Sequence, residues 1–254
     1  MNFFKLIGVE LQKIRRSHIF WILLIPVVLL WIPTLVNYDF IMTPATEGLS
    51  PEHNFFIQSF MVLAWFMFPA SMVVCTVLLV QTERSHGGIL KMLTLPVTPA
   101  ALCAAKFVVL LLLAAVQVVL MTVCYYPCAS IVSHLNGYNL ILSPLFVLRE
   151  AGIFYLSGIP MAAVFWLIAV CVRTPIFSMG IGLASIVPSV LAINTKVWFA
   201  YPMCYPFYRI MILMNGLPNG DTHLDLIPLL PMAIGITIVC LTGACLFFGK
   251  SERR

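Results

Sequence analysis

Three consecutive residues near the end of the chain have the residue types of a phosphate-binding loop. Gly249-Lys250-Ser251 matches the last three positions of a P-loop, whose backbone amides and lysine hold nucleotide phosphates. That motif also needs a glycine five positions before its second glycine, and the residue found there is Ala244. We therefore expect no cofactor in this chain. If ATP and magnesium drive the protein, they bind to another polypeptide.

The other reactive side chains form no catalytic or metal-binding pattern. The sequence has no HExxH or GxSxG motif, and its long apolar runs contain no pair of carboxylates. Gln117 lies deep in one such run, but one amide does not make a catalytic group of residues. No metal-spaced pair occurs among the five histidines, which are His18, His53, His86, His134 and His223. We therefore expect neither an enzyme nor a metal site.

The chain has eight cysteines, which could suggest disulfides or zinc. Most lie inside apolar runs, where cysteine behaves as a small buried hydrophobe, and no spacing fits a zinc site. Cys124 and Cys128 are one helical turn apart, a poor geometry for a disulfide within a regular helix. We expect all eight thiols to be structural.

The composition identifies the surroundings of the chain as lipid. Of 254 residues, 62% are hydrophobic and 9% are charged, and the mean hydropathy is +1.05, whereas soluble domains have roughly 25% charged residues. A bilayer core of ~30 Å needs about 20 apolar residues per helix. The sequence predicts an all-α polytopic membrane protein, one domain over residues 1–254, with a six-span bundle over residues 19–248. The six predicted spans are Ile19–Val36, Phe55–Val80, Ala100–Tyr126, Ile153–Val172, Ile176–Ile193 and Leu226–Phe248.

Basic residues are unevenly distributed between the two sides that six spans create. Both termini share a side with the loop at residues 81–99 and with Arg173-Thr174-Pro175, the short turn between the fourth and fifth spans. That side has eleven Lys and Arg residues and the other has three, namely Arg149, Lys196 and Arg209. Because basic residues favour the cytoplasmic side, we expect cytoplasmic termini. The outer side also has six acids, which give it a net charge of about −3: Asp39, Glu47, Glu52, Glu150, Asp221 and Asp225.

Residues 2–16 have the pattern of an amphipathic helix. At 100° per residue, one stripe is apolar and comprises Phe3, Phe4, Ile7, Leu11 and Ile14. Lys5, Lys13 and Arg16 lie opposite, so the pattern favours a helix in the membrane interface, with its basic side toward anionic headgroups. The alternative is a simple continuation of the first span, anchored by its basic residues.

Two further segments allow two interpretations each. Residues 194–225 are rich in Trp and Tyr, which indicates either an aromatic belt at the headgroups or a re-entrant segment. Gly180 and Gly182 in the fifth span favour close helix packing over a break at a binding site. Lys106 lies within two turns of one end of the third span, where its stem can snorkel to the interface.

The loop at residues 81–99, QTERSHGGILKMLTLPVTP, is polar and separates two long apolar runs. Gly87-Gly88 bends it, an apolar stretch over residues 89–95 follows, and Pro96 and Pro99 end it. This pattern predicts a short amphipathic helix that docks a soluble partner. Glu83 has a simpler alternative role, since an acid in a first turn also stabilises a helix.

The order of these parts resembles the permease subunits of type 2 ABC exporters. Such permeases have an amphipathic elbow helix, six spans and a coupling helix between the second and third spans. Their coupling loops show a pattern that matches Glu83-Arg84, Gly87/Gly88, Ile89–Leu93, Leu95-Pro96 and Lys106. The resemblance implies that the following residues contact an ATPase: Thr82, Glu83, Arg84, Ser85, His86, Gly87, Gly88, Ile89, Leu90, Lys91, Met92 and Leu93.

The chain length and the opening FFKLIGVELQKIRRS are similar to those of lantibiotic immunity and resistance permeases. That resemblance implies two membrane subunits, often different, and two cytosolic ATPases that bind ATP and Mg²⁺. It implies removal of cationic antimicrobial peptides from the plasma membrane of a Gram-positive bacterium, with membrane lipid and peptide as partners and no nucleic acid.

Other functions stay open at this point. Within the exporter class, a drug, lipid or polysaccharide is an alternative substrate. A membrane anchor or sensor that recruits a cytosolic protein through the same loop is a second class, and a multipass enzyme is a third, which the apolar span interiors argue against.

Overall fold

The computed structural model of the chain describes residues 3–15, 19–38, 43, 46–84, 98–219 and 226–251. All regular secondary structure within these residues is helical. They include six helical segments long and apolar enough to cross a membrane, which confirms the predicted all-α polytopic fold. These segments are Ile19–Val36, Pro51–Gln81, Pro99–Asn136, Pro144–Cys171, Pro175–Ala192 and Leu229–Phe248.

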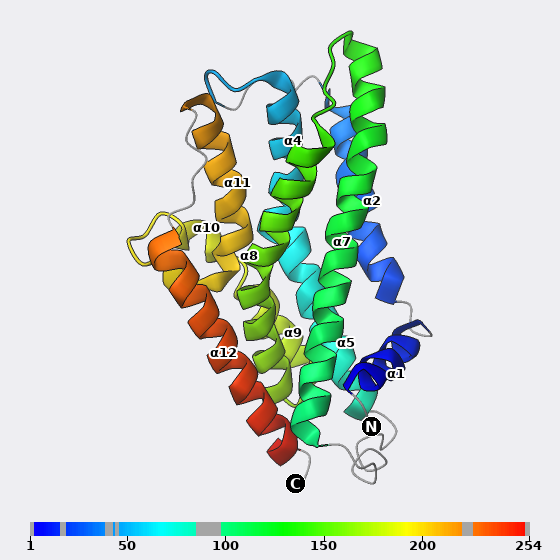
Figure 1. Cartoon of the computed structure of the whole chain (residues 1–254), viewed down its shortest axis with the longest axis vertical. Helices are drawn as coiled ribbons and strands as arrows, with labels where there is room; N and C mark the ends of the chain where they lie inside the picture. The colour runs from blue at the N-terminus through cyan, green and yellow to red at the C-terminus, as the bar shows by residue number, and fades with distance from the viewer. Residues whose placement is uncertain are drawn as a thin grey trace.

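The long helices run side by side along the molecule, and the N-terminal helix lies against one end of the bundle (Figure 1). Helix α1 and the end of α12 are both at that end. In chain order the helices are α1 (Phe3–Arg15), α2 (Ile19–Val36), α4 (Pro51–Val62), the π-helix η1 (Leu63–Met67), α5 (Phe68–Arg84), α7 (Pro99–Asn136), α8 (Pro144–Cys171), α9 (Pro175–Ala184), α10 (Ser189–Ala192), the 3₁₀-helices η3 (Trp198–Ala200) and η4 (Pro202–Cys204), α11 (Tyr205–Gly216), the 3₁₀-helix η5 (Leu217–Asn219) and α12 (Leu226–Ser251).

The third span is longer than the sequence predicted. Helix α7 has 38 residues, about 57 Å at 1.5 Å per residue, and continues ten residues past Tyr126. Thr98 caps its start by accepting a hydrogen bond from the Ala101 N–H, and Gly137 ends it with φ +67°. Near the other end, the buried Tyr125 hydroxyl donates to the Leu140 carbonyl (2.9 Å). The connection to α8 is thereby fastened to α7.

The fifth span, which the sequence predicted over Ile176–Ile193, is divided into two helices. Helix α9 ends at Ala184 and α10 has four residues, Ser189–Ala192. Pro188 lies in the break, where it has no N–H to continue the helical hydrogen bonds.

Residues 198–219 fold into further short helices, of which α11 is the longest. Helix α11 packs against α8 and α4, with Ile210 and Leu213 buried. The aromatic segment is therefore a packed part of the bundle and more than a belt of aromatic side chains.

Two glycines allow close approach between spans. A Cβ at Gly182 would lie 2.7 Å from Cγ1 of Val73, and one at Gly158 would lie 2.6 Å from Cε1 of Phe68. The predicted role in close packing is therefore correct for Gly182. It is wrong for Gly180, where an added Cβ would meet no atom within 4 Å.

Candidate functional site

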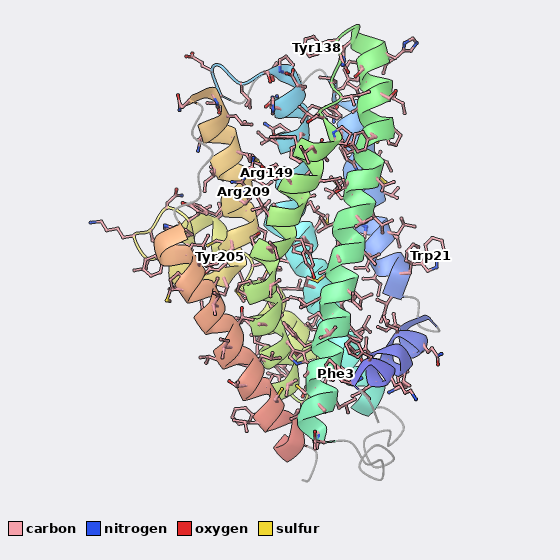
Figure 2. All side chains as sticks on the ribbon, viewed as in Figure 1. Phe3, Trp21, Tyr138, Arg149, Tyr205 and Arg209 are labelled. Atoms are coloured by element: carbon pink, nitrogen blue, oxygen red, sulfur yellow. The ribbon has the colours of Figure 1, made fainter. Side chains whose placement is uncertain are left out.

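The two ends of the bundle differ in what they bring together. The end of α5, the start of α7 and the turn between α8 and α9 lie at the same end as α1 and the end of α12 (Figure 1). Phe3 of α1 lies near this end, and Tyr138 lies at the opposite one (Figure 2). We call the first end the junction end. The predicted coupling loop begins and ends there.

The backbone of α5 continues helically through the first three predicted coupling residues, Thr82, Glu83 and Arg84. The other predicted coupling residues lie outside the described part of the chain, namely Ser85, His86, Gly87, Gly88, Ile89, Leu90, Lys91, Met92 and Leu93. Their predicted role stays a prediction.

The second predicted loop, Arg173-Thr174-Pro175, is a tight turn. Thr174 has an extended backbone (φ −86°, ψ 117°) and Pro175 occupies the first position of α9, as the sequence predicted. The turn lies beside the last turns of α5, because Gln81, Val172 and Pro175 line one small pocket. If the end of α5 moves, it therefore pushes directly on the turn between α8 and α9.

The apolar stripe of α1 is divided between the bundle and the exterior. Ile7 and Ile14 are partly buried against the core, whereas Phe3, Phe4 and Leu11 are exposed. Helix α1 packs mainly on α7. The side of α1 that faces the bundle therefore does not coincide with the predicted apolar stripe. One edge of the stripe, with Ile7 and Ile14, packs on protein, and the other edge, with Phe3, Phe4 and Leu11, can contact lipid.

An ion pair inside the junction end joins α1 to α7. Glu10 is 1% exposed and Lys106 is 0% exposed, and the Lys106 Nζ donates to Glu10 Oε2 at 2.5 Å. Lys13, at the more exposed rim, donates to the other oxygen, Oε1, at 2.7 Å.

The expectation that Lys106 snorkels to the interface is wrong, because its ammonium turns inward to a carboxylate 96 positions away. Sequence reasoning missed Glu10. The available signal was its position three residues after Ile7 and four before Ile14, an acid on an apolar stripe.

A second buried ion pair joins α8 to α11. Arg209 Nε donates to Glu150 Oε2 at 3.0 Å, and Arg209 Nη2 bonds to the same oxygen. Their exposures are 2% and 3%, and Arg209 lies beside α8 (Figure 2). The sequence assigned both residues to the outer side without predicting that they pair; they are buried because α8 begins before Ile153 and α11 packs against it. The pair contains one charge of each sign, so the outer net charge of about −3 is unchanged.

At the end opposite the junction end, Tyr138 donates a hydrogen bond to Glu52 Oε2 at 2.6 Å. This bond to a carboxylate raises the pKa of Tyr138, because it holds the phenol proton. The bond joins the segment between α7 and α8, which contains Tyr138, to the start of α4, which contains Glu52.

A polar contact inside the bundle joins α5 to α7, the helices on either side of the coupling loop. Gln117 Nε2 donates to Ser71 Oγ at 2.9 Å, and Ser71 donates to the Met67 carbonyl at 2.7 Å. Met67 ends the π-helix η1. A single π-turn interrupts regular helical bonding and is frequent at functional sites. The second span therefore has an irregular turn next to its polar contact with the third.

This arrangement defines a polytopic helical membrane protein in which an amphipathic N-terminal helix packs on the third span and on the first span at the junction end. Residues 6–189, most of the chain, match the family model described as ABC-2 family transporter protein. The chain belongs to this family, whose members are transmembrane permeases of ABC transporters, which implies association with ABC ATPase subunits. Comparison with curated proteins and with solved structures finds no significant match.

Proposed function

We propose that the chain is the permease subunit of an ATP-driven exporter that removes lantibiotics or other cationic antimicrobial peptides from the plasma membrane. The observation that carries the exporter part is the family match, together with the junction end, where α5 and α7 flank the predicted coupling loop and α7 packs on α1. The chain itself is not an enzyme in this proposal. ATP and Mg²⁺ bind to two cytosolic ATPase subunits, and a second, similar permease completes the complex.

Two features support a cationic peptide as the substrate. The outer segments have more acids than bases, which suits a cation, although depletion of bases there also follows from membrane topology. The opening of the chain and its loop resemble those of lantibiotic immunity permeases, which act on such peptides. In this proposal, both termini and the junction end face the cytoplasm of a Gram-positive cell.

Coupling between ATPase and permease follows from the arrangement of the junction end. Residues Thr82–Leu93 occupy a groove on the ATPase, so that closure of the ATPase pair moves the ends of α5 and α7. Because α5 packs on α8 and α9 beside this turn, its movement also displaces the fourth and fifth spans. Substrate then binds between the two membrane subunits, near the outer leaflet.

The substrate is tested by ATPase activity of the reconstituted complex, with and without nisin. Increased hydrolysis on addition of nisin is the expected result. A stable complex with no response to nisin, and a response to a drug, lipid or polysaccharide, would contradict the peptide substrate. Binding of a cytosolic partner without any nucleotide-dependent change would instead indicate an anchor or sensor.

A further inference from the structure

We propose that Glu10 is a positioning residue for coupling. Through its buried bond to Lys106, Glu10 makes α1 and the first turns of α7 move as one unit when the ATPase displaces the coupling loop. This inference rests on the proposed function, and it adds a residue outside the coupling loop and outside the predicted apolar stripe.

The location of Lys106 makes it suited to this role. Helix α7 begins at Pro99, directly after the coupling loop, and Lys106 lies seven residues further, about 10 Å along the helix axis. Over this length an α-helix is stiff, because each residue adds one backbone hydrogen bond to the helix. A displacement of the start of α7 at Pro99 therefore reaches Lys106 through continuous helix.

The burial of the pair makes separation of α1 from α7 unfavourable. Glu10 and Lys106 are both at most 1% exposed, so water cannot replace the lost partner when the helices part. An unpaired charge in the interior is far less stable than a paired one, since the interior does not solvate it. Movement of α7 with α1 keeps the pair, and movement of α7 alone breaks it.

Helix α1 also contacts the first span. It packs on α2 as well as on α7, and it precedes α2 in the chain. If α1 follows α7, the movement of the third span reaches the first span, which is not adjacent to the coupling loop in the sequence. Because α7 also packs directly on α2, Glu10 gives the first span a second route of coupling, through α1.

The test uses two variants and one matched control. Glu10→Gln keeps the size of the side chain and one acceptor oxygen but removes its charge, and the exchange Glu10→Lys/Lys106→Glu places a pair of opposite charges at the same two positions with their signs reversed. Lys13→Met removes the more exposed partner of the same carboxylate (side-chain exposure 40%) and leaves the buried bond in place. All are measured in the complete complex with its ATPase.

The first readout is nisin-stimulated ATPase activity relative to basal activity. We expect Glu10→Gln to lower the stimulation about fivefold or more, the lower range of measured couplings between sites, with basal activity and complex assembly retained. The exchange variant should recover stimulation, and Lys13→Met should resemble the wild type.

The second readout is hydrogen exchange of α1 and of the start of α7, with and without vanadate-trapped nucleotide. In the wild type both helices should change, and in Glu10→Gln the change should persist in α7 and be lost in α1. An unchanged response of α1 in Glu10→Gln would overturn the role of Glu10 alone. If the wild-type α7 shows no nucleotide-dependent change, the proposed function itself fails, and this inference with it.

Discussion

Buried charges in the described part of this bundle occur as pairs of opposite sign, Glu10 with Lys106 and Glu150 with Arg209. The members of each pair come from different helices and are separated by 96 and 59 positions in the sequence. Ion pairs inside a protein are costly to form and costly to break. They therefore fix which helix faces which, more than they add to overall stability.

The α8–α11 pair gives a direct prediction at this scale. Glu150→Ala should lower the free energy of unfolding by about 3–5 kcal/mol, because it leaves the Arg209 guanidinium buried without this carboxylate. Arg149→Ala is the matched control, since Arg149 is adjacent and exposed, and it should change stability by less than ~0.5 kcal/mol. The measurement is chemical unfolding in detergent. Equal effects of the two substitutions would contradict a buried pair at Glu150.

The packing of α9 on α5 can be tested at the scale of elements. Gly182→Ala should destabilise the protein by about 1–3 kcal/mol, because its Cβ would overlap with Val73 and push the two helices apart. Gly180→Ala, two residues away in open space, should instead be neutral or stabilise the helix by up to ~1 kcal/mol. The measurement is the thermal unfolding temperature of the two variants in the same detergent. A destabilised Gly180→Ala protein would contradict the described packing.

The coupling loop gives a second prediction at the element scale. Glu83→Ala should reduce transport while the protein inserts and assembles normally, because Glu83 lies at the start of the segment that we propose contacts the ATPase. Transport is measured as survival of cells challenged with nisin, at matched protein levels. Full resistance in the variant would contradict a coupling role for Glu83.

The elements were predictable from the sequence to the extent that hydropathy decides them. The first span, Ile19–Val36, has the predicted bounds, and the turn before Pro175 is where the sequence placed it. The π-turn at Leu63–Met67 was not predicted, because an apolar run gives the same hydropathy whether its helix is regular or interrupted. The break before α10 coincides with Pro188, a helix-breaking residue visible in the sequence. The extension of α7 beyond Tyr126 was missed because its polar residues end the apolar window without ending the helix.

The candidate site was predictable only where it is local. The loop stands out by composition, and the stripe of α1 by periodicity. The Glu10–Lys106 contact was not predictable from spacing, because it joins two helices whose relative placement depends on the packing of the whole bundle. A lysine near a helix end can reach either water or a buried acid, and only the tertiary fold decides between them.

At the scale of the whole molecule, we propose that ATP hydrolysis acts on the membrane domain at the junction end. This end contains α1, the end of α12, the two ends of the predicted coupling loop and the α8–α9 turn. The ion pair between α1 and α7 also lies there. Movement that enters at the loop can therefore reach the first to fifth spans through contacts that the structure describes.

The most direct test is nisin-stimulated ATPase activity of the complex copurified from cells that express this permease with its ATPase, compared with the Glu83→Ala/Arg84→Ala variant. We predict that the double variant assembles with the ATPase and keeps basal hydrolysis, but loses stimulation by the peptide. Undiminished stimulation in the double variant, or no complex with any ABC ATPase, would contradict coupling through this loop.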